Sequence, residues 1–310
     1  MKAKKMGFVY CAKGEQSWWE THLMAPAPMI YDNYTIRVFV GCWDKNGISR
    51  IGYIDVDREN PCKVLKISER PVLDIGDIGC FDDNGVFPAH VYKISDHEVR
   101  LYYTGFQKGD KISFYNFTGC AISCDNGNNF QRLSKAPTLD RADEGLYTRA
   151  GQSIYPATDG GFHCVYSAGS GWYYIGGKER PIYEVFYQKS NDGIHLLENG
   201  TKIIGCDLNV EHGLGRPQII QLGEYYWVFY TRRIIENMRY FLGCARTKDF
   251  KNWERRDDVF KDISFGESGS FDEKMIYFPG VVKVSNTEAY CFYTGNHYGE
   301  DGLGCIKLTF

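Results

Sequence analysis

The sequence predicts an all-β fold, a five-bladed β-propeller with four strands in each blade. Three observations support this prediction: an internal repeat, an alternation of apolar and polar residues that is typical of strands, and the lack of a clear helical periodicity. Five units with a period of about 60 residues fill the 310 residues of the chain. We therefore expect residues 1–310 to form a single domain.

Each repeat contains a Pro or small residue, an apolar alternating run, and then an aromatic-rich strand that ends in Thr or Ser. The units start at Pro26, Pro88, Gln152, Pro217 and Pro279. The gaps between these starting points are 62, 64, 65 and 62 residues. The third unit has no Pro at this point, so its register depends on Tyr166 and Ser167.

A third and a fourth strand are expected in each unit. In the second, third and fourth units a turn with an Asp comes before a fourth strand that carries Phe130, residues 195–197 or Trp253. The Asn-Gly and Asp-Gly pairs at 126–127 and 192–193 are typical of hairpin turns. The last unit lacks a fourth strand. We expect residues 6–12 to supply it by pairing with residues 303–310, which would close the ring.

The composition limits the classes of partner. A hydrophobic content of 43% is enough for a large core, and a formal net charge of −3 argues against nucleic acid as a partner. The longest apolar run at the N-terminus is about four residues, shorter than a signal peptide needs, and no stretch is long enough for a membrane span. We expect a cytoplasmic protein without a membrane partner, whose 11 cysteines are mostly free thiols. The sequence predicts no cofactor. No spacing of its acids is diagnostic of a metal site, so no metal ligand is assigned, and the metal requirement and the oligomeric state stay open.

Acidic residues precede the first strands at similar positions. In a propeller the loops that lead into these strands form one mouth of the central channel. Glu20, Asp82, Glu211 and Glu273 each stand six residues before the start of a unit. We expect them to converge at this mouth, although each could instead bind backbone amides in its own loop. Of the adjacent residues Asp82 and Asp83, Asp83 is more typical of a turn, because Asn84-Gly85 follows it.

Arginines and aromatic residues accompany these acids. The predicted substrate-binding residues are Glu20, His22, Asp83, Arg149, Trp172, Arg216, Arg232, Arg233, Glu273, Tyr277, His297 and Tyr298. Because a guanidinium binds carboxylate or phosphate groups bidentately, the four arginines indicate an anionic ligand. They could equally neutralise the acids of the mouth, and both interpretations stay open.

Several strings resemble a known group of proteins. They are FDDNGVFP (81–88), YYTG (102–105), SCDNGNNFQR (123–132), GRPQII (215–220), FDEKMIYFP (271–279) and YTGNHYGEDGLG (293–304). They look like the five-bladed glycosidase-like propellers related to glycoside hydrolase families 43 and 32. The likeness covers nearly the whole chain and is closest to members from surface-polysaccharide gene clusters. It implies a sugar site at the channel mouth.

The chain departs from the family pattern at the catalytic positions. Family 43 uses a general base, a general acid and a third acid on the first three blades. Here residues 25–28 read Ala-Pro-Ala-Pro where the base would stand, and the third blade has no Glu at the expected place. The strand motifs of family 32 are absent. Only Asp82 falls near a family acid.

We expect an enzyme that acts on a glycosidic bond in surface-polysaccharide metabolism, with an anionic sugar as one candidate substrate. The predicted catalytic residues are Asp82, Glu211 and Asp272, with Arg216 holding one acid ionised while another keeps its proton. The alternatives are a glycosyl transferase or phosphorylase on the same scaffold, and a carbohydrate-binding propeller without catalysis. The expected ligand is a carbohydrate or a sugar phosphate.

Overall fold

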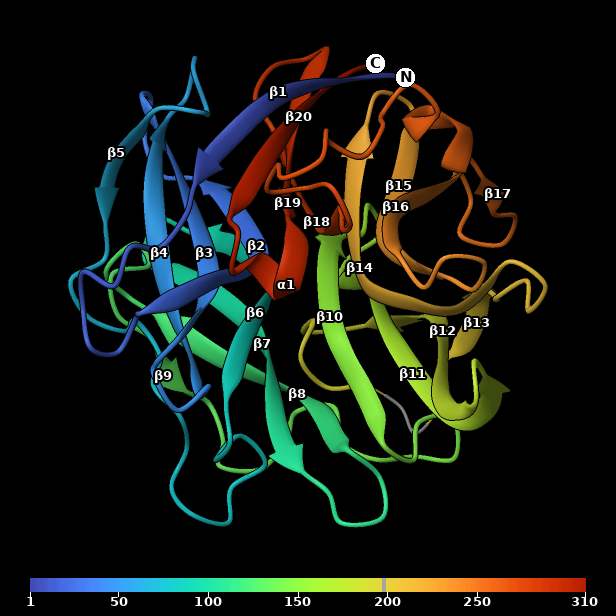
Figure 1. Ribbon diagram of the computed structural model, residues 1–310. Coiled ribbons are helices and arrows are strands. Elements are labelled where there is room, and N and C mark those ends of the chain that lie inside the picture. The colour runs from blue at the N-terminus through green and yellow to red at the C-terminus, as the bar shows by residue number, and fades with distance from the viewer. Residues whose placement is uncertain (197–198) are drawn as a thin grey trace.

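The computed structural model is an all-β protein with a curled sheet, and it describes residues 1–196 and 199–310 (Figure 1). Two short helices, η1 (Asp257–Phe260) and α1 (Asn296–Gly299), interrupt the strands. No described helix has the length and apolar character that a membrane crossing requires. All 11 cysteines are free, as the sequence predicted.

The described strands form five antiparallel groups of four. Group 1 contains β2 (Thr21–Ile30), β3 (Thr35–Trp43), β4 (Ser49–Asp57) and β5 (Val64–Ile67). Group 2 contains β6 (Val86–Ser95), β7 (Glu98–Lys108), β8 (Phe114–Ser123) and β9 (Gln131–Arg132). Group 3 contains β10 (Thr148–Pro156), β11 (Phe162–Ile175), β12 (Lys178–Ser190) and β13 (Thr201–Ile204). Group 4 contains β14 (Glu211–Leu222), β15 (Tyr225–Ile234), β16 (Tyr240–Thr247) and β17 (Glu254–Arg255). Group 5 contains β18 (Tyr277–Lys283), β19 (Glu288–Thr294), β20 (Leu303–Thr309) and β1 (Lys2–Tyr10).

The first strands of the groups, which we call the inner strands, contact one another in a closed ring. β2 contacts β6, β6 contacts β10, β10 contacts β14, β14 contacts β18, and β18 contacts β2. These strands are buried along much of their length, and β2 is buried at eight consecutive positions, from His22 to Met29. Because they have neighbours on both faces, consecutive residues are buried in them, including polar ones such as Gln152 and Gln218, rather than every second residue.

The hydrophobic core lies between neighbouring groups. One cluster packs Phe39 and Tyr53 of group 1 against Leu101 and Tyr103 of group 2. Another packs Phe229 of group 4 with residues of group 5, and a third joins groups 1 and 5. Since each group buries side chains against its neighbours, the ring is stable only when it is complete.

The N-terminal strand completes group 5, as the sequence predicted. β1 pairs with β20 from Lys2 opposite Thr309 to Tyr10 opposite Leu303, so the two chain ends lie side by side (Figure 1). The strand begins four residues earlier than expected. The fourth strands of groups 2, 3 and 4 begin later than expected: β9 follows Phe130, β17 follows Trp253, and β13 starts at Thr201. Leu197, which was assigned to such a strand, lies outside the described residues.

Every inner strand contains a β-bulge near the start of its unit. The register shifts after Met24, Pro88, Ala150, Gly215 and Tyr277. At four of these bulges the backbone is left-handed, at Ala25 (φ 58°), Gly151 (φ 72°), Arg216 (φ 49°) and Phe278 (φ 52°). Side chains other than glycine rarely adopt this conformation, and bulges of this kind redirect a side chain beside a functional site.

We expect that removal of residues 1–12 destabilises the protein and promotes its association. The deletion exposes the hydrogen-bonding edge of β20, and an unpaired strand edge pairs readily with another chain. Light scattering and thermal unfolding of the truncated protein measure both effects.

A synthetic peptide of residues 1–12, added in trans, serves as the control and should restore the monomer. A truncated protein that stays monomeric and unfolds at the unchanged temperature would contradict the closure of group 5 by β1.

Candidate functional site

A pocket lies where the inner strands begin, and we call it the start-side pocket. It has a volume of ≈ 80 Å³. Its polar lining residues are Thr104, Asn116, Thr148, Ser167, Tyr183 and Arg216. Phe87 and Phe278 add aromatic surface, and the Oδ1 atom of Asn116 is buried without a hydrogen-bond partner. No Asp or Glu is among the described residues that line it. The pocket therefore offers hydroxyl, amide and guanidinium groups and aromatic surface rather than carboxylates.

Arg216 occupies the axis of the ring. Its guanidinium donates to the carbonyl oxygens of Pro88 (3.1 Å), Pro279 (2.8 Å), Ala25 (3.0 Å) and Pro26 (2.6 Å). The side chain is 4% exposed, and burial lowers its pKa to about 9. The expectation that Arg216 holds a catalytic acid ionised is not met, because its hydrogen-bond partners among the described residues are backbone carbonyls of three other inner strands.

Asp82 and Asp272 are buried and bound to cations of outer strands. Asp82 is 0% exposed, and its Oδ2 atom accepts a hydrogen bond from Arg132 of β9 at 2.8 Å. Asp272 is 2% exposed and forms an ion pair with Lys5 of β1 at 2.6 Å. The loops before β6 and β18 are thereby tied to the fourth strands of groups 2 and 5.

The two loops that carry these acids have the same hydrogen bonds. The amide of Gly76 donates to the carbonyl of Asp82, and the amide of Gly266 donates to the carbonyl of Asp272. A Cβ atom on Gly76 would stand 2.1 Å from the Asp82 carboxylate, so this position requires glycine. Asp272 is thus the structural equivalent of Asp82.

This equivalence changes the interpretation of Glu273. The amide of Gly269 donates to Glu273, just as the amide of Gly79 donates to Asp83. Glu273 therefore corresponds to Asp83, although its distance in sequence from the start of the unit matched it to Asp82. One additional residue in the loop before β18 explains the offset.

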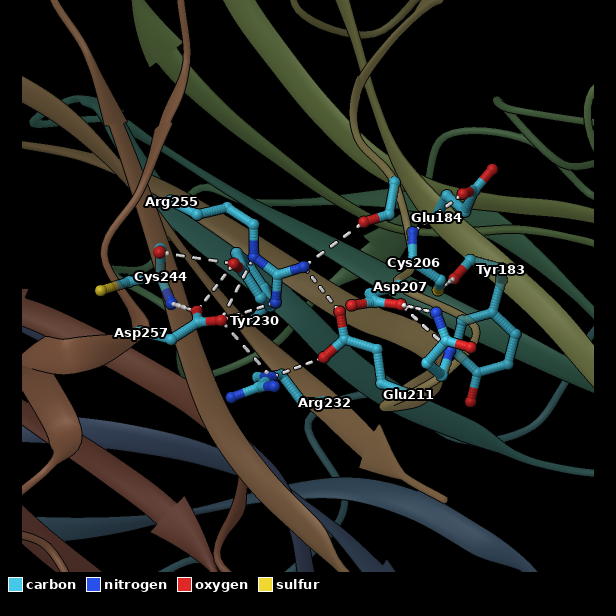
Figure 2. A network of polar contacts seen from close by, with 12 residues as sticks. Tyr183, Glu184, Cys206, Asp207, Glu211, Tyr230, Arg232, Cys244, Arg255 and Asp257 are labelled. Carbon is cyan, nitrogen blue, oxygen red and sulfur yellow. Dashed lines mark hydrogen bonds and ion pairs between the residues drawn. The ribbon is translucent and has the colours of Figure 1, made fainter. Parts of the chain in front are cut away.

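Glu211 lies in a network of acids and arginines in group 4 (Figure 2). Its carboxylate accepts hydrogen bonds from Arg232 and from Arg255, each at 2.6 Å, and Arg255 also binds Asp257. Glu211 is 0% exposed. Burial alone raises its pKa, but the hydrogen bonds from Arg255 and Arg232 hold the pKa below its usual value. Glu211 is therefore an ionised group inside an ion-pair network.

A tyrosine of the second strand binds an acid in three groups. Tyr166 donates to Glu144 at 2.6 Å, Tyr230 to Asp257 at 2.9 Å, and Tyr293 to Asp272 at 2.7 Å. Glu144 and Asp257 were not singled out from the sequence. The signal was a Tyr followed by Thr or Ser in the second strand, which recurs at Tyr103, Tyr166, Tyr230 and Tyr293.

The structure brings the predicted acids into separate contacts. Among the described residues no hydrogen bond or ion pair joins any two of Asp82, Glu211 and Asp272, and each has its partners within its own group. Glu20 has no side-chain hydrogen bond in the described part of the chain, although its amide donates to Trp43.

Arg149 and Arg232 are also engaged by acids. Arg149 forms an ion pair with Glu144 at 3.0 Å, and Arg232 forms its shortest one with Glu211. Of the four arginines predicted to bind an anion, Arg233 is the one that has neither an ion pair nor backbone carbonyls as partners in the described residues. It is therefore the predicted arginine that remains available to a ligand.

Tyrosines surround Arg233 beside the start-side pocket. Its guanidinium carbon lies 5.4 Å from the ring centroid of Tyr183 and 5.1 Å from that of Tyr240, and Nη2 donates to the Tyr240 hydroxyl at 2.6 Å. Tyr183 lines the pocket itself. The hydroxyl of Tyr277 is buried without a partner, and Tyr298 contacts Tyr240 through their hydroxyls at 3.3 Å.

A second guanidinium adds to the positive charge of this region. Arg180 of β12 has no ion pair among the described residues, and its Nε atom, like that of Arg233, is buried without a hydrogen-bond partner. Burial, together with the charges of Arg233 and Arg180, lowers the pKa of His212 to about 4. His212 is therefore neutral near pH 7 and adds no third positive charge to this region.

The other predicted ligand-binding residues lie in local contacts. His22 stacks on Trp43 with centroids 3.9 Å apart, and burial lowers its pKa. Trp172 packs against Tyr147 at 4.9 Å. His297 contacts Asp301 at 3.3 Å. The described residues include no group of three or more His, Cys, Asp or Glu that could hold a metal ion.

Comparison with known proteins defines the class of fold. No protein-family model matches the chain. The uncharacterized protein Rv1502 of Mycobacterium tuberculosis (strain ATCC 25618 / H37Rv) is 28% identical over 312 residues, which cover 99% of each chain. A thermostable family-43 glycoside hydrolase superposes with a TM-score of 0.66 at 13% identity, over 93% of this chain and 90% of that one.

A structure from the GH130 family of mannoside phosphorylases, which contains glycoside hydrolases acting on β-1,2 mannosidic linkages, superposes with a TM-score of 0.67 at 17% identity. The match covers 99% of this chain and 90% of that chain. The protein therefore has the fold of propeller-type glycoside hydrolases, as the sequence resemblance indicated.

We expect Arg216→Met to lower the free energy of unfolding by at least about 3 kcal/mol, because the substitution leaves several carbonyls buried without donors. Chemical denaturation of the purified variant measures this change.

Arg246→Met is the matched control, since Arg246 pairs with the half-exposed Glu254 on an outer strand. Arg216→Lys should give an intermediate loss. If Arg216→Met unfolds at the same denaturant concentration as Arg246→Met or at a higher one, the guanidinium does not hold the ring together.

Proposed function

We propose that the protein is a carbohydrate-active protein built on a five-bladed β-propeller, and that it binds an anionic sugar beside the start-side pocket. Each antiparallel group of four strands would be one blade. The closed ring of contacts among the five inner strands supports this count. The similarity in fold to glycoside hydrolases supports the sugar as ligand.

Among the described residues Arg233 has no acidic partner, and this observation carries the choice of an anionic ligand. The guanidinium lies beside Tyr183 and Tyr240, and Arg180 brings a second positive charge. A carboxylate or phosphate on a sugar would accept hydrogen bonds from a guanidinium. The tyrosine hydroxyls suit the hydroxyls of the sugar, and the tyrosine rings suit its apolar face. A sugar acid or a sugar phosphate fits this combination.

Catalysis at a glycosidic bond is a second candidate function. The fold of the neighbouring glycoside hydrolases favours it, and the buried Oδ1 atom of Asp82 has no hydrogen-bond partner among the residues that the structure describes. A hydrolase would need two carboxylates across a cleft, and a phosphorylase would need one acid and a phosphate site. The cations around Arg233 would suit a phosphate. The burial of Asp82, Glu211 and Asp272 in separate contacts favours binding over hydrolysis by these three acids.

We expect a uronic acid to bind about tenfold more tightly than the corresponding neutral sugar, because only the acid can pair with Arg233. Titration calorimetry with glucuronate and glucose measures the difference. Raising the salt concentration should weaken the preference, since mobile ions screen the charges.

Arg233→Met should remove the preference for the charged sugar, whereas the control Arg246→Met should keep it. Equal affinities for the two sugars in the unmodified protein would eliminate the anionic ligand. Comparison with glucose 1-phosphate separates a phosphate from a carboxylate preference.

Asp82→Asn distinguishes a structural acid from a catalytic one. Because the substitution breaks a buried ion pair with Arg132, we expect the free energy of unfolding to fall by about 3 kcal/mol and any turnover of chromogenic glycosides to stay within about tenfold. A catalytic role predicts the reverse, a loss of roughly two to four decades in rate at an unchanged melting temperature.

The control is Asp83→Asn, at the neighbouring position, where the carboxylate accepts one exposed backbone hydrogen bond. It should change stability far less. If Asp82→Asn lost turnover while keeping its stability, the second candidate would replace the first.

A further inference from the structure

A second and larger pocket lies at the opposite ends of the inner strands, and we call it the end-side pocket. Its volume is ≈ 510 Å³, and all five inner strands contribute to its lining. Its walls include the rings of Tyr31, Tyr92 and Tyr155 and the side chains of Met29 and Ile220. A volume of this size falls in the range of pockets that bind small organic molecules.

His90 gives this pocket a polar group. It lines the pocket, is 6% exposed, and accepts a hydrogen bond at Nδ1 from the amide of Ile154 at 3.3 Å. The described residues provide no partner for its Nε2 atom. A neutral imidazole that accepts at Nδ1 carries its proton at Nε2. The nitrogen left to the pocket is therefore a hydrogen-bond donor.

The protonation of His90 is consistent with this role. The pKa of His90 is lowered to about 3, mainly by burial and secondly by the nearby charge of Arg216. The ring is thus neutral near pH 7. Arg216 itself has no anionic partner among the described residues, so its positive charge is not neutralised locally.

The rim of the pocket carries further positive charge. Lys93 and Lys283 are exposed and belong to the lining, and Asp32 is the only acid among the described lining residues. Lys93 pairs with Asp96, which is itself exposed, whereas Lys283 has no ion pair in the described residues. Two lysines at a mouth attract anions over several ångströms.

We propose that the end-side pocket binds a small organic monocarboxylate with an aromatic or branched aliphatic body. The carboxylate accepts the hydrogen bond of His90 Nε2, and the body lies between the tyrosine rings. The charge of Arg216 offsets part of the cost of removing the carboxylate from water. Because Arg216 fills the axis between the two pockets, this site is separate from the sugar site proposed above.

Benzoate and its uncharged counterpart benzyl alcohol test the proposal by titration calorimetry on the intact protein. We expect benzoate to bind about tenfold more tightly than benzyl alcohol. His90→Phe keeps an aromatic ring and removes the donor. It should weaken benzoate binding by about tenfold and benzyl alcohol binding much less, because a hydrogen bond to a charged acceptor is stronger than one to a hydroxyl.

A second variant does not depend on the buried histidine. Lys93→Glu combined with Lys283→Glu reverses two exposed charges and should weaken benzoate binding by about threefold or more at low salt. Lys45→Glu, at an exposed position in the turn between β3 and β4, is the matched control and should have no effect on binding.

The proposal would be overturned if benzoate did not bind below about 10 mM or if benzoate and benzyl alcohol bound with equal affinity. A benzoate affinity unaffected by both His90→Phe and the double lysine variant would also overturn it. Arg233→Met separates the two sites. If it abolished benzoate binding, the carboxylate would occupy the start-side region, and the end-side pocket would not be its site.

Discussion

The ring depends on the hydrogen bonds that the guanidinium of Arg216 donates to backbone carbonyls of other strands. The guanidinium reaches from β14 to backbone carbonyls of β2, β6 and β18, and thereby joins four of the five inner strands by hydrogen bonds. A left-handed backbone at Arg216 directs the side chain inward. The same side chain fills the axis, so the two ends of the ring become two pockets rather than one channel.

Buried acids hold the periphery in a similar way. Asp82 binds Arg132 of β9, and Asp272 binds Lys5 of β1, so each acid ties the loop before an inner strand to the outermost strand of its group. Lys5 comes from the chain terminus that completes group 5. The acids thus stand where the sequence suggested catalytic carboxylates, but their charges are already balanced inside the fold.

The consequence for function is a start-side pocket whose chemistry is cationic and aromatic. Arg149 and Arg232 are neutralised by acids, which leaves Arg233 among the tyrosines as the candidate for an anionic ligand. A fold shared with glycoside hydrolases does not by itself fix the reaction, since function depends on the residues placed at the site. The proposals for the two pockets therefore rest on different residues and are tested by different variants.

The sequence by itself determined the repeating unit, the all-β class and the closure by the N-terminal strand. A regular spacing and an apolar pattern specify which residues pair as strands, because both are local properties of the chain. The partners of the charged residues were decided by the tertiary structure. Lys5 and Asp272 are far apart in sequence and meet only in the folded ring. One additional residue in the loop before β18 makes Asp272, rather than Glu273, the structural equivalent of Asp82. Side chains in loops meet partners from other strands only after the ring has closed, so no periodicity in the sequence could assign them.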